Sequence, residues 1–207
     1  GPLYCAQYDN RWFVVWGWGV NAYHSLYEEV SGLIAVNDSC LFRGKRNGKE
    51  FVVCVKKSEN PYECGVYQKV QDPSWVEDKP LYAAYDGTHW FVVWGDVEYK
   101  KYDSVQGQLS IVDNKPLYCA WRNGRSFVVW GHQEYKEHGF IADHPRIVGG
   151  EPLYSVSESC HSWAVVWGEK EYQAYDMIEH IAGVIDNQPV FSARQGDSTL
   201  LIWGWED

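Results

Sequence analysis

Three tryptophans at one repeated position of the sequence could form a binding surface. Trp12, Trp90 and Trp163 each stand just before an apolar segment, such as Phe91-Val92-Val93-Trp94. The other copies of this position hold Glu50, Ser126 and Thr199. Because tryptophan is enriched at binding hot spots, we predict that the three side chains stack on sugar rings or on apolar side chains of a partner. Packing at the outer edge of neighbouring repeats is the alternative.

Two cysteines replace aromatic residues in one copy of the pattern. Cys54 stands where another copy has Trp94, and Cys64 stands where it has Tyr99. In a regular hairpin these positions face each other across the turn, so we predict a Cys54–Cys64 disulfide. Two independent buried thiols are the alternative, because free cysteine packs well in cores. A disulfide indicates an oxidising compartment, so we expect an extracellular or periplasmic location.

No other pattern points to catalysis, a cofactor or a metal ion. The remaining cysteines give no basis for pairing and no zinc-type spacing: Cys5, Cys40, Cys119 and Cys160. His138 replaces a tyrosine of the repeat, and its spacing from His132 and His144 is not that of metal ligands. Nucleophile-elbow, phosphate-loop and dinucleotide patterns are absent from the sequence. We therefore expect a protein that is not an enzyme and holds no cofactor or metal.

These positions belong to a sequence repeat that covers nearly all of the 207 residues. Each copy runs from Pro-Leu-Tyr to Phe-Val-Val-Trp-Gly or a close variant, and the copies begin near residues 2, 40, 80, 116, 152 and 189. The spacing, roughly 36–40 residues, is typical of solenoids and propellers. Because one repeat cannot bury its own apolar face, we expect residues 1–207 to form a single domain.

Each copy is predicted to contain four β-strands and no helix. The first two strands, 116–121 and 127–130 in one copy, flank Asn123-Gly124, which favours a tight hairpin because Asn and Gly tolerate positive φ. A third strand is expected from Tyr99 to Val105, followed by a short fourth strand over 109–112. The Phe-Val-Val-Trp strands are apolar on both sides, so we expect both of their faces to be covered. The tryptophans of Trp-Gly are therefore expected in the core.

Carboxylates follow the repeat tyrosines at Glu28, Asp103 and Asp176. Such a set could line a channel or hold a cation. Acidic side chains commonly accept hydrogen bonds from backbone N–H groups near turns. We predict that these three carboxylates fix turns in this way.

The stretch from Asp113 to Ala120, followed by a Gly turn, Phe-Val-Val-Trp-Gly and Glu-Tyr-x-x-Tyr-Asp, resembles the WD40-like repeats of TolB-type β-propellers. The resemblance implies an all-β propeller of four-stranded antiparallel blades, and it implies a protein-docking platform. Six predicted hairpins favour six blades, of which the first and last are incomplete. Five blades with an extra hairpin, or an open stack, are alternatives.

The amino-acid composition limits the classes of partner that the protein is expected to bind. The net charge is −10, which disfavours nucleic acid, and no apolar run approaches the roughly 18 residues of a membrane span, so we expect no membrane insertion. The 12 Trp and 15 Tyr exceed the usual content of a core. We predict a non-catalytic binding protein, either a protein-docking platform or scaffold or, alternatively, a lectin-like multivalent carbohydrate-binding protein. The turn residues vary from copy to copy, which favours a single protein-docking face.

Overall fold

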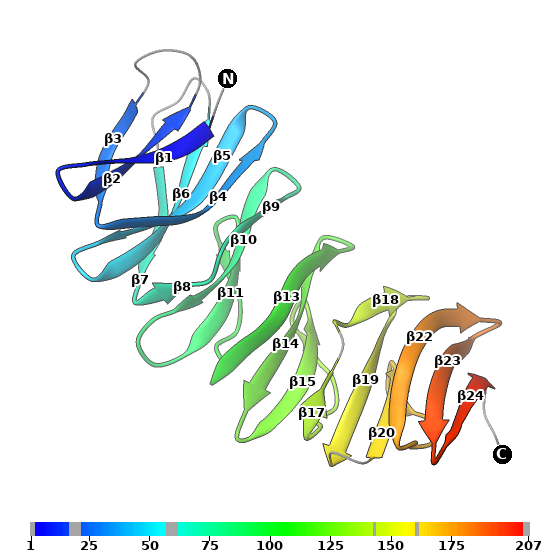
Figure 1. Ribbon diagram of the computed structural model, residues 1–207. Helices are drawn as coiled ribbons and strands as arrows, with labels where there is room; N and C mark the ends of the chain where they lie inside the picture. Colours follow the sequence, from blue (N-terminus) through cyan, green and yellow to red (C-terminus); the bar gives the residue numbers. More distant parts are fainter. Residues whose placement is uncertain (1–2, 17–21, 57–61, 143, 160–161, 205–207) are drawn as a thin grey trace. The chain divides into compact units, whose positions relative to one another are not determined.

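The computed structural model describes residues 3–16, 22–56, 62–142, 144–159 and 162–204. Within these ranges it contains 24 β-strands and no helix, and the strands form six antiparallel sheets of three to five strands (Figure 1). The protein therefore has an all-β, propeller-like fold. None of the described residues forms a helix that could cross a membrane. The chain divides into two compact units, Gly1–Lys101 and Tyr102–Asp207.

The first unit contains three sheets, named A, B and C in chain order. Sheet A is three-stranded, whereas sheet B has four strands and sheet C has five. Sheet A comprises β1 (Leu3–Tyr8), β2 (Arg11–Trp16) and β3 (Ala22–Tyr27). Sheet B comprises β4 (Glu29–Val36), β5 (Ser39–Arg46), β6 (Lys49–Lys56) and β7 (Tyr62–Tyr67). Sheet C comprises β8 (Lys69–Val70), β9 (Ser74–Val76), β10 (Lys79–Tyr85), β11 (Trp90–Trp94) and β12 (Val97–Glu98).

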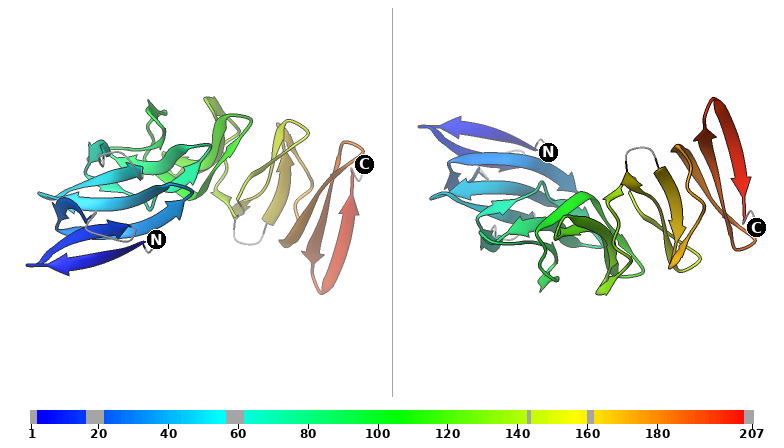
Figure 2. Two further views of the ribbon diagram at one scale, coloured as in Figure 1. Left: turned by 90° about the horizontal axis from the view of Figure 1, so that it is seen from above. Right: turned by 90° about the horizontal axis from the view of Figure 1, so that it is seen from below.

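The second unit contains sheets D, E and F, which stack face to face (Figures 1 and 2). Sheet D comprises β13 (Ser104–Val112), β14 (Lys115–Arg122), β15 (Arg125–Trp130) and β16 (Gln133–Glu134). Sheet E comprises β17 (Phe140–Ile141), β18 (Arg146–Val148), β19 (Glu151–Ser159), β20 (Ser162–Trp167) and β21 (Lys170–Glu171). Sheet F comprises β22 (Met177–Ile185), β23 (Gln188–Gln195) and β24 (Ser198–Trp203).

The predicted first-to-second-strand hairpins are present in every sheet. At Asn123-Gly124, between β14 and β15, both residues have positive φ, 52° and 79°. This is the geometry that the sequence predicts for a two-residue turn. The turn after β10 is longer, because Tyr85 pairs with Trp90. There the Asp86 carboxylate accepts hydrogen bonds from the two backbone N–H groups that follow Gly87, at 2.8 and 2.9 Å.

The predicted strand order of a blade is wrong in one respect. No third strand runs from Tyr99 to Val105: the short strand β12 pairs with β11, and β13 pairs instead with the following hairpin strand, β14. The predicted fourth strand, 109–112, is the end of β13. The cause is the turn between β13 and β14, where Asp113 and Asn114 have φ of 51° and 56°. A two-residue turn of this kind joins adjacent antiparallel strands directly, so the strand before it belongs to the next hairpin.

The strands of the Phe-Val-Val-Trp type are buried on both faces in sheets B to E, as predicted, but the last copy, in sheet F, is not: Leu201 is 79% and Trp203 60% exposed, so the prediction of a core tryptophan is wrong for Trp203. In β11, Phe91, Val92 and Val93 are at most 2% exposed, and Trp94 is 7% exposed. Three repeat tryptophans also donate their indole N–H groups across the central hairpin strand to carbonyl oxygens of the strand on its other side: Trp94 to Val76 at 3.4 Å, Trp130 to Val112 at 3.1 Å and Trp167 to Val148 at 2.9 Å. These tryptophans therefore stabilise the sheets rather than offer a free surface.

A buried tyrosine just before the first strand of sheets B, C and D is tethered by a hydrogen bond to the last strand of that sheet. Its hydroxyl donates to a glutamate in three copies: Tyr27 to Glu63 at 3.5 Å, Tyr67 to Glu98 at 3.3 Å and Tyr102 to Glu134 at 3.0 Å. Two of these tyrosines, Tyr27 and Tyr67, are themselves the last residues of the preceding sheets, A and B. The Tyr102 ring also packs edge-on against Phe127, with centroids 5.4 Å apart. The tether is thus a regular part of the repeat, and its absence in a copy marks a local change.

Candidate functional site

The residue after the repeat tyrosine (Tyr27, Tyr102 or Tyr175) holds a turn in three of the sheets. In sheet D, the Asp103 carboxylate accepts the N–H of Asn123 at 2.9 Å. The equivalent bonds run from the N–H of Asn47 to Glu28 at 2.8 Å and from the N–H of Gly196 to Asp176 at 2.7 Å. The prediction that these carboxylates fix turns is confirmed.

Sheet E departs from this arrangement at both positions. His138 replaces the tyrosine, and Gly139 replaces the carboxylate. The hydrogen bond is reversed, because the Gly139 N–H now donates to Oε1 of Glu158, a residue of the neighbouring strand, at 3.2 Å. Position 139 therefore has no side chain to accept a turn N–H, and the Glu158 carboxylate is the acceptor instead.

The backbone itself requires glycine at position 139. A Cβ atom there would lie 2.9 Å from the carbonyl oxygen of Ser157, closer than real Cβ contacts come. Because that obstacle is backbone, it cannot turn aside as a flexible side chain would. The close approach of these two chain segments is therefore built into sheet E.

Glu158 is held in place by several donors. Nη2 of Arg125, the first residue of β15, lies 3.0 and 2.9 Å from the two carboxylate oxygens and also donates to the carbonyl of Glu137 at 3.1 Å. Partial burial acts to raise the pKa of Glu158, but the Arg125 guanidinium and the Gly139 N–H outweigh it, so the pKa lies below its usual value. Glu158 is therefore an oriented carboxylate at neutral pH.

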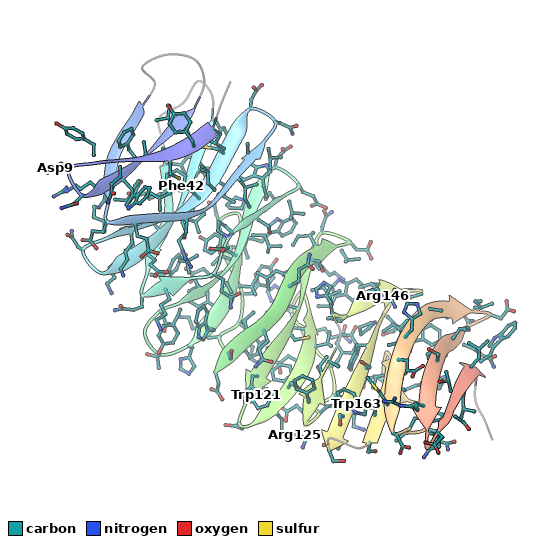
Figure 3. The ribbon with its side chains drawn as sticks, in the orientation of Figure 1. Asp9, Phe42, Trp121, Arg125, Arg146 and Trp163 are labelled. Carbon is teal, nitrogen blue, oxygen red and sulfur yellow. The ribbon has the colours of Figure 1, made fainter. Side chains whose placement is uncertain are left out.

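The space beside Gly139 is a pocket of about 320 Å³. It is lined by Gly139, Phe140, Ser157, Glu158, Ser159 and Trp163. The Trp163 and Phe140 rings stand nearly perpendicular, at 88°, with centroids 6.1 Å apart. Figure 3 shows Arg125 and Trp163 at the turn ends of the hairpins of sheets D and E. We call this feature, defined by its six lining residues, the Trp163 pocket.

His138 lies directly behind this pocket and is fully buried. Its ring packs edge-on against Tyr154 at 6.2 Å, and its Nδ1 lies 3.3 Å from Oε1 of Glu158. Burial lowers the pKa of His138 below its usual value, although the Glu171 and Glu158 carboxylates oppose that shift. The imidazole is therefore neutral at neutral pH, and it takes the place of a tyrosine without repeating the tyrosine–glutamate bond.

The three predicted tryptophans lie in three different surroundings. Trp163 lines a pocket, whereas Trp90 stacks on its strand neighbour Tyr85, with centroids 5.3 Å apart. Trp12 is half-buried and pairs in register with Gln7 of β1. The three positions are equivalent in sequence but do not form three similar sites.

The predicted Cys54–Cys64 disulfide is not formed. The two Sγ atoms are 3.0 Å apart, which is a contact between free thiols and longer than the roughly 2.05 Å of a disulfide bond. The physical reason is register: Cys54 pairs with Tyr62, whereas Cys64 pairs with Val52, so the cysteines are diagonal rather than opposite. Of the other cysteines, Cys5, Cys40 and Cys119 are also free, and Cys160 lies outside the described residues.

Sequence reasoning missed most of the Trp163 pocket. It named Trp163 but not Phe140, Glu158 or Arg125. A usable signal was present, because positions 138 and 139 are where this copy departs from the Tyr-Asp pair of its neighbours. What no spacing reveals is that a residue of the preceding sheet, Arg125, reaches across to orient Glu158.

The chain matches no protein-family model and no curated protein. Solved structures with a weak likeness to this chain include the following two. KlHsv2 with loop 6CD replaced by a Gly-Ser linker is 8% identical, with a TM-score of 0.40 over 89% of this chain and 68% of that chain. A chain from a structural and mechanistic analysis of two prolyl endopeptidases is 9% identical, with a TM-score of 0.29 over 97% of this chain and 49% of that chain. Neither likeness assigns a family or an activity to this chain.

Proposed function

We propose that this protein is a non-catalytic binding module that docks a partner protein through the Trp163 pocket. The observation that carries the proposal is that the pocket lies in sheet E, where both His138 and Gly139 depart from the repeat. Residues that the fold requires recur from copy to copy. A local departure that opens a hollow lined by two aromatic rings serves recognition rather than stability.

The pocket suits one apolar or aromatic side chain of a partner. Trp163 and Phe140 supply two perpendicular apolar walls, and a volume of about 320 Å³ accommodates a single large side chain. Because Arg125 already neutralises Glu158, an uncharged group can enter the pocket without burying an unpaired carboxylate. Tryptophan and arginine at such a place are typical of the anchor points of protein interfaces.

The charge of the second unit favours a partner with basic residues around its anchor. Residues 102–207 contain fifteen carboxylates against seven lysines and arginines, and they therefore hold most of the net charge of −10. Complementary charge around an apolar anchor speeds association and selects partners. We therefore expect an apolar anchor residue flanked by Lys or Arg.

A multivalent lectin is the second candidate, and the surroundings of the tryptophans weaken it. A lectin of that kind uses several similar sites, but Trp12, Trp90 and Trp163 differ in their neighbours. The predicted extracellular or periplasmic location rested on the disulfide and loses that support. A glycan array on the purified chain tests this candidate: binding that needs all three tryptophans would replace our proposal with the lectin.

We take each of the six sheets as one propeller blade, with incomplete first and last blades. Sheets A and F have three strands each. The tyrosine–glutamate tether and the carboxylate-held turn recur among the sheets at equivalent positions, which supports one blade per sheet. Six blades within one domain of 1–207 is therefore the arrangement that we propose, in preference to five.

Phage display tests the docking site directly. A random peptide library is selected on the wild-type chain and counter-selected on Trp163→Ala. We expect enriched peptides with an aromatic or aliphatic anchor that bind the wild-type chain and the matched control Trp90→Ala but not Trp163→Ala. A selection that enriches no Trp163-dependent peptide would overturn the proposal.

A further inference from the structure

A second departure from the repeat, in the first unit, removes an aromatic ring from between two sheets. Position 64 is equivalent to Tyr135 and Tyr172, because each lies opposite the second residue of a Phe-Val-Val segment. Tyr135 and Tyr172 are both 5% exposed, and their rings belong to the apolar layers between sheets D and E and between sheets E and F. Between sheets B and C the equivalent residue is Cys64, whose side chain is much smaller.

The space that the missing ring would fill is hollow. A cavity of about 240 Å³ lies between β7 and sheet C, and Cys64, Tyr82 and Val93 line its interior. The same layer also has Cys54 where the layer between sheets D and E has Trp130. Two large aromatic side chains are therefore replaced by thiols in one interlayer, which accounts for a cavity at this place.

The mouth of this cavity is acidic. Glu63, Asp96 and Glu98 line it, and none of its described lining residues is a lysine or arginine. Glu63 is paired with Arg46 at 2.9 Å, whereas Asp96 is exposed to solvent. A group that enters the cavity therefore passes a rim with excess negative charge, which favours a cation at the outer end of the ligand.

The wall of the cavity is preorganised by hydrogen bonds. The Tyr82 hydroxyl donates to the carbonyl of Cys64 at 2.7 Å, and the Tyr67 hydroxyl donates to Glu98 at 3.3 Å. Tyr82 is 1% exposed, so this wall is fixed without a ligand. A preformed cavity whose polar groups are held in place is a common form of a small-molecule site.

We propose that this cavity binds a small aromatic amine, with its ring in the slot that tyrosine fills elsewhere in the chain and its ammonium group at the acidic rim. The ring replaces the missing Tyr135-type contact against Tyr82 and Val93. The ammonium group lies near Asp96 and Glu98. This site is in the first unit and is independent of the Trp163 pocket, so either proposal can fail without the other.

The test compares the wild-type chain with Cys64→Tyr, which restores the residue of the other repeats. Tyramine is titrated into each protein by calorimetry, in the presence of a phosphine reductant that keeps the thiols reduced. We expect saturable one-to-one binding to the wild-type chain and at least tenfold weaker binding to Cys64→Tyr, whose own ring occupies the slot. Absence of saturable binding to the wild-type chain, or equal binding to both, would overturn the proposal.

A second comparison keeps the test informative if Cys64→Tyr fails to fold. Asp96→Asn changes an exposed rim residue and leaves the slot intact. We expect it to weaken tyramine binding several-fold, and we expect 4-hydroxyphenylacetate, which has a carboxylate in place of the amine, to bind the wild-type chain more weakly than tyramine. Equal affinity for the amine and the carboxylate would contradict the assigned orientation.

Discussion

Sheets D and E are built from the same repeat, yet their residues at this end of the hairpin differ, and in sheet E they line an aromatic pocket. In sheet D, Tyr102 is 2% exposed and bonds to Glu134, and Asp103 holds the next turn. In sheet E, His138 is buried without such a bond to the equivalent glutamate, and Gly139 donates to Glu158 instead. Tyr102 and Asp103 in sheet D therefore show the contacts that stabilise a repeat, whereas His138 and Gly139 in sheet E accompany a pocket.

The recessed site of sheet E coincides with two substitutions in the repeat, at His138 and Gly139. Replacing Asp by Gly removes a side chain and reverses one hydrogen bond. The strand pairing also differs, because the first strand is continuous in sheet D (β13) but divided into β17 and β18 in sheet E. Glu158 then becomes the acceptor, and Arg125 orients it from the neighbouring sheet. Four changes to these two sheets test the comparison, from the largest expected effect to the smallest.

Truncating the tether ring in sheet D should cost the most stability. Tyr102→Ala removes a buried ring that packs against Phe127 and Tyr118, so we expect a loss of about 3–5 kcal/mol in the free energy of unfolding. Urea denaturation measures it. Tyr8→Ala is the matched control, because Tyr8 is 76% exposed and its loss should be nearly neutral. Equal effects of the two changes would contradict the tether.

Adding one methyl group in sheet E should also destabilise the protein. Gly139→Ala places a Cβ 2.9 Å from a backbone oxygen, and we expect a cost of about 1–3 kcal/mol. The measurement is the midpoint of chemical unfolding. A variant as stable as the wild-type chain would show that the close approach of residues 139 and 157 is not required.

Removing the turn carboxylate of sheet D should have a smaller effect. Asp103→Ala leaves the N–H of Asn123 without its acceptor, so we expect a loss of about 0.5–1.5 kcal/mol. Glu29→Ala, at an exposed carboxylate of β4, serves as the control. Thermal unfolding of both variants measures the loss. If Asp103→Ala were as stable as the wild-type chain, the repeated carboxylates would have no role in stability.

The buried histidine should make sheet E sensitive to mild acid. Because burial lowers the pKa of His138 in the folded chain, the unfolded chain binds the proton first as the pH falls below about 6.5. Stability is therefore unaffected by His138 above that pH and decreases below it. We expect the melting temperature of the wild-type chain to fall between pH 7 and pH 5 more than that of His138→Tyr. Identical pH profiles would show that His138 does not titrate with unfolding.

Much of the fold was predictable because the same turn residues and apolar segments recur in each copy of the repeat. Turns such as Asn123-Gly124 and the buried Phe91-Val92-Val93 segment follow from local chemistry, and the structure confirms them. The assignment of strands to sheets failed at Asp113-Asn114. The sequence shows that a turn is present there, but not that it joins two strands of the same sheet.

The candidate site was predictable only in part. Trp163 stood out because tryptophan recurs at its position in alternate copies, and Trp12 and Trp90 stood out equally, although their surroundings differ. The disulfide prediction failed because a shift of register makes Cys54 and Cys64 diagonal. Both errors share a cause: equivalence in the repeat fixes the place of a residue along a strand but not its neighbours on adjacent strands.

The most direct test of the central claim is calorimetric titration of a peptide selected on the wild-type chain into three proteins: wild type, Trp163→Ala and Trp90→Ala. If the departures in sheet E create the docking site, the dissociation constant rises at least tenfold for Trp163→Ala and is unchanged for Trp90→Ala, with both variants folded. Equal weakening in both variants, or none in Trp163→Ala, would contradict the account.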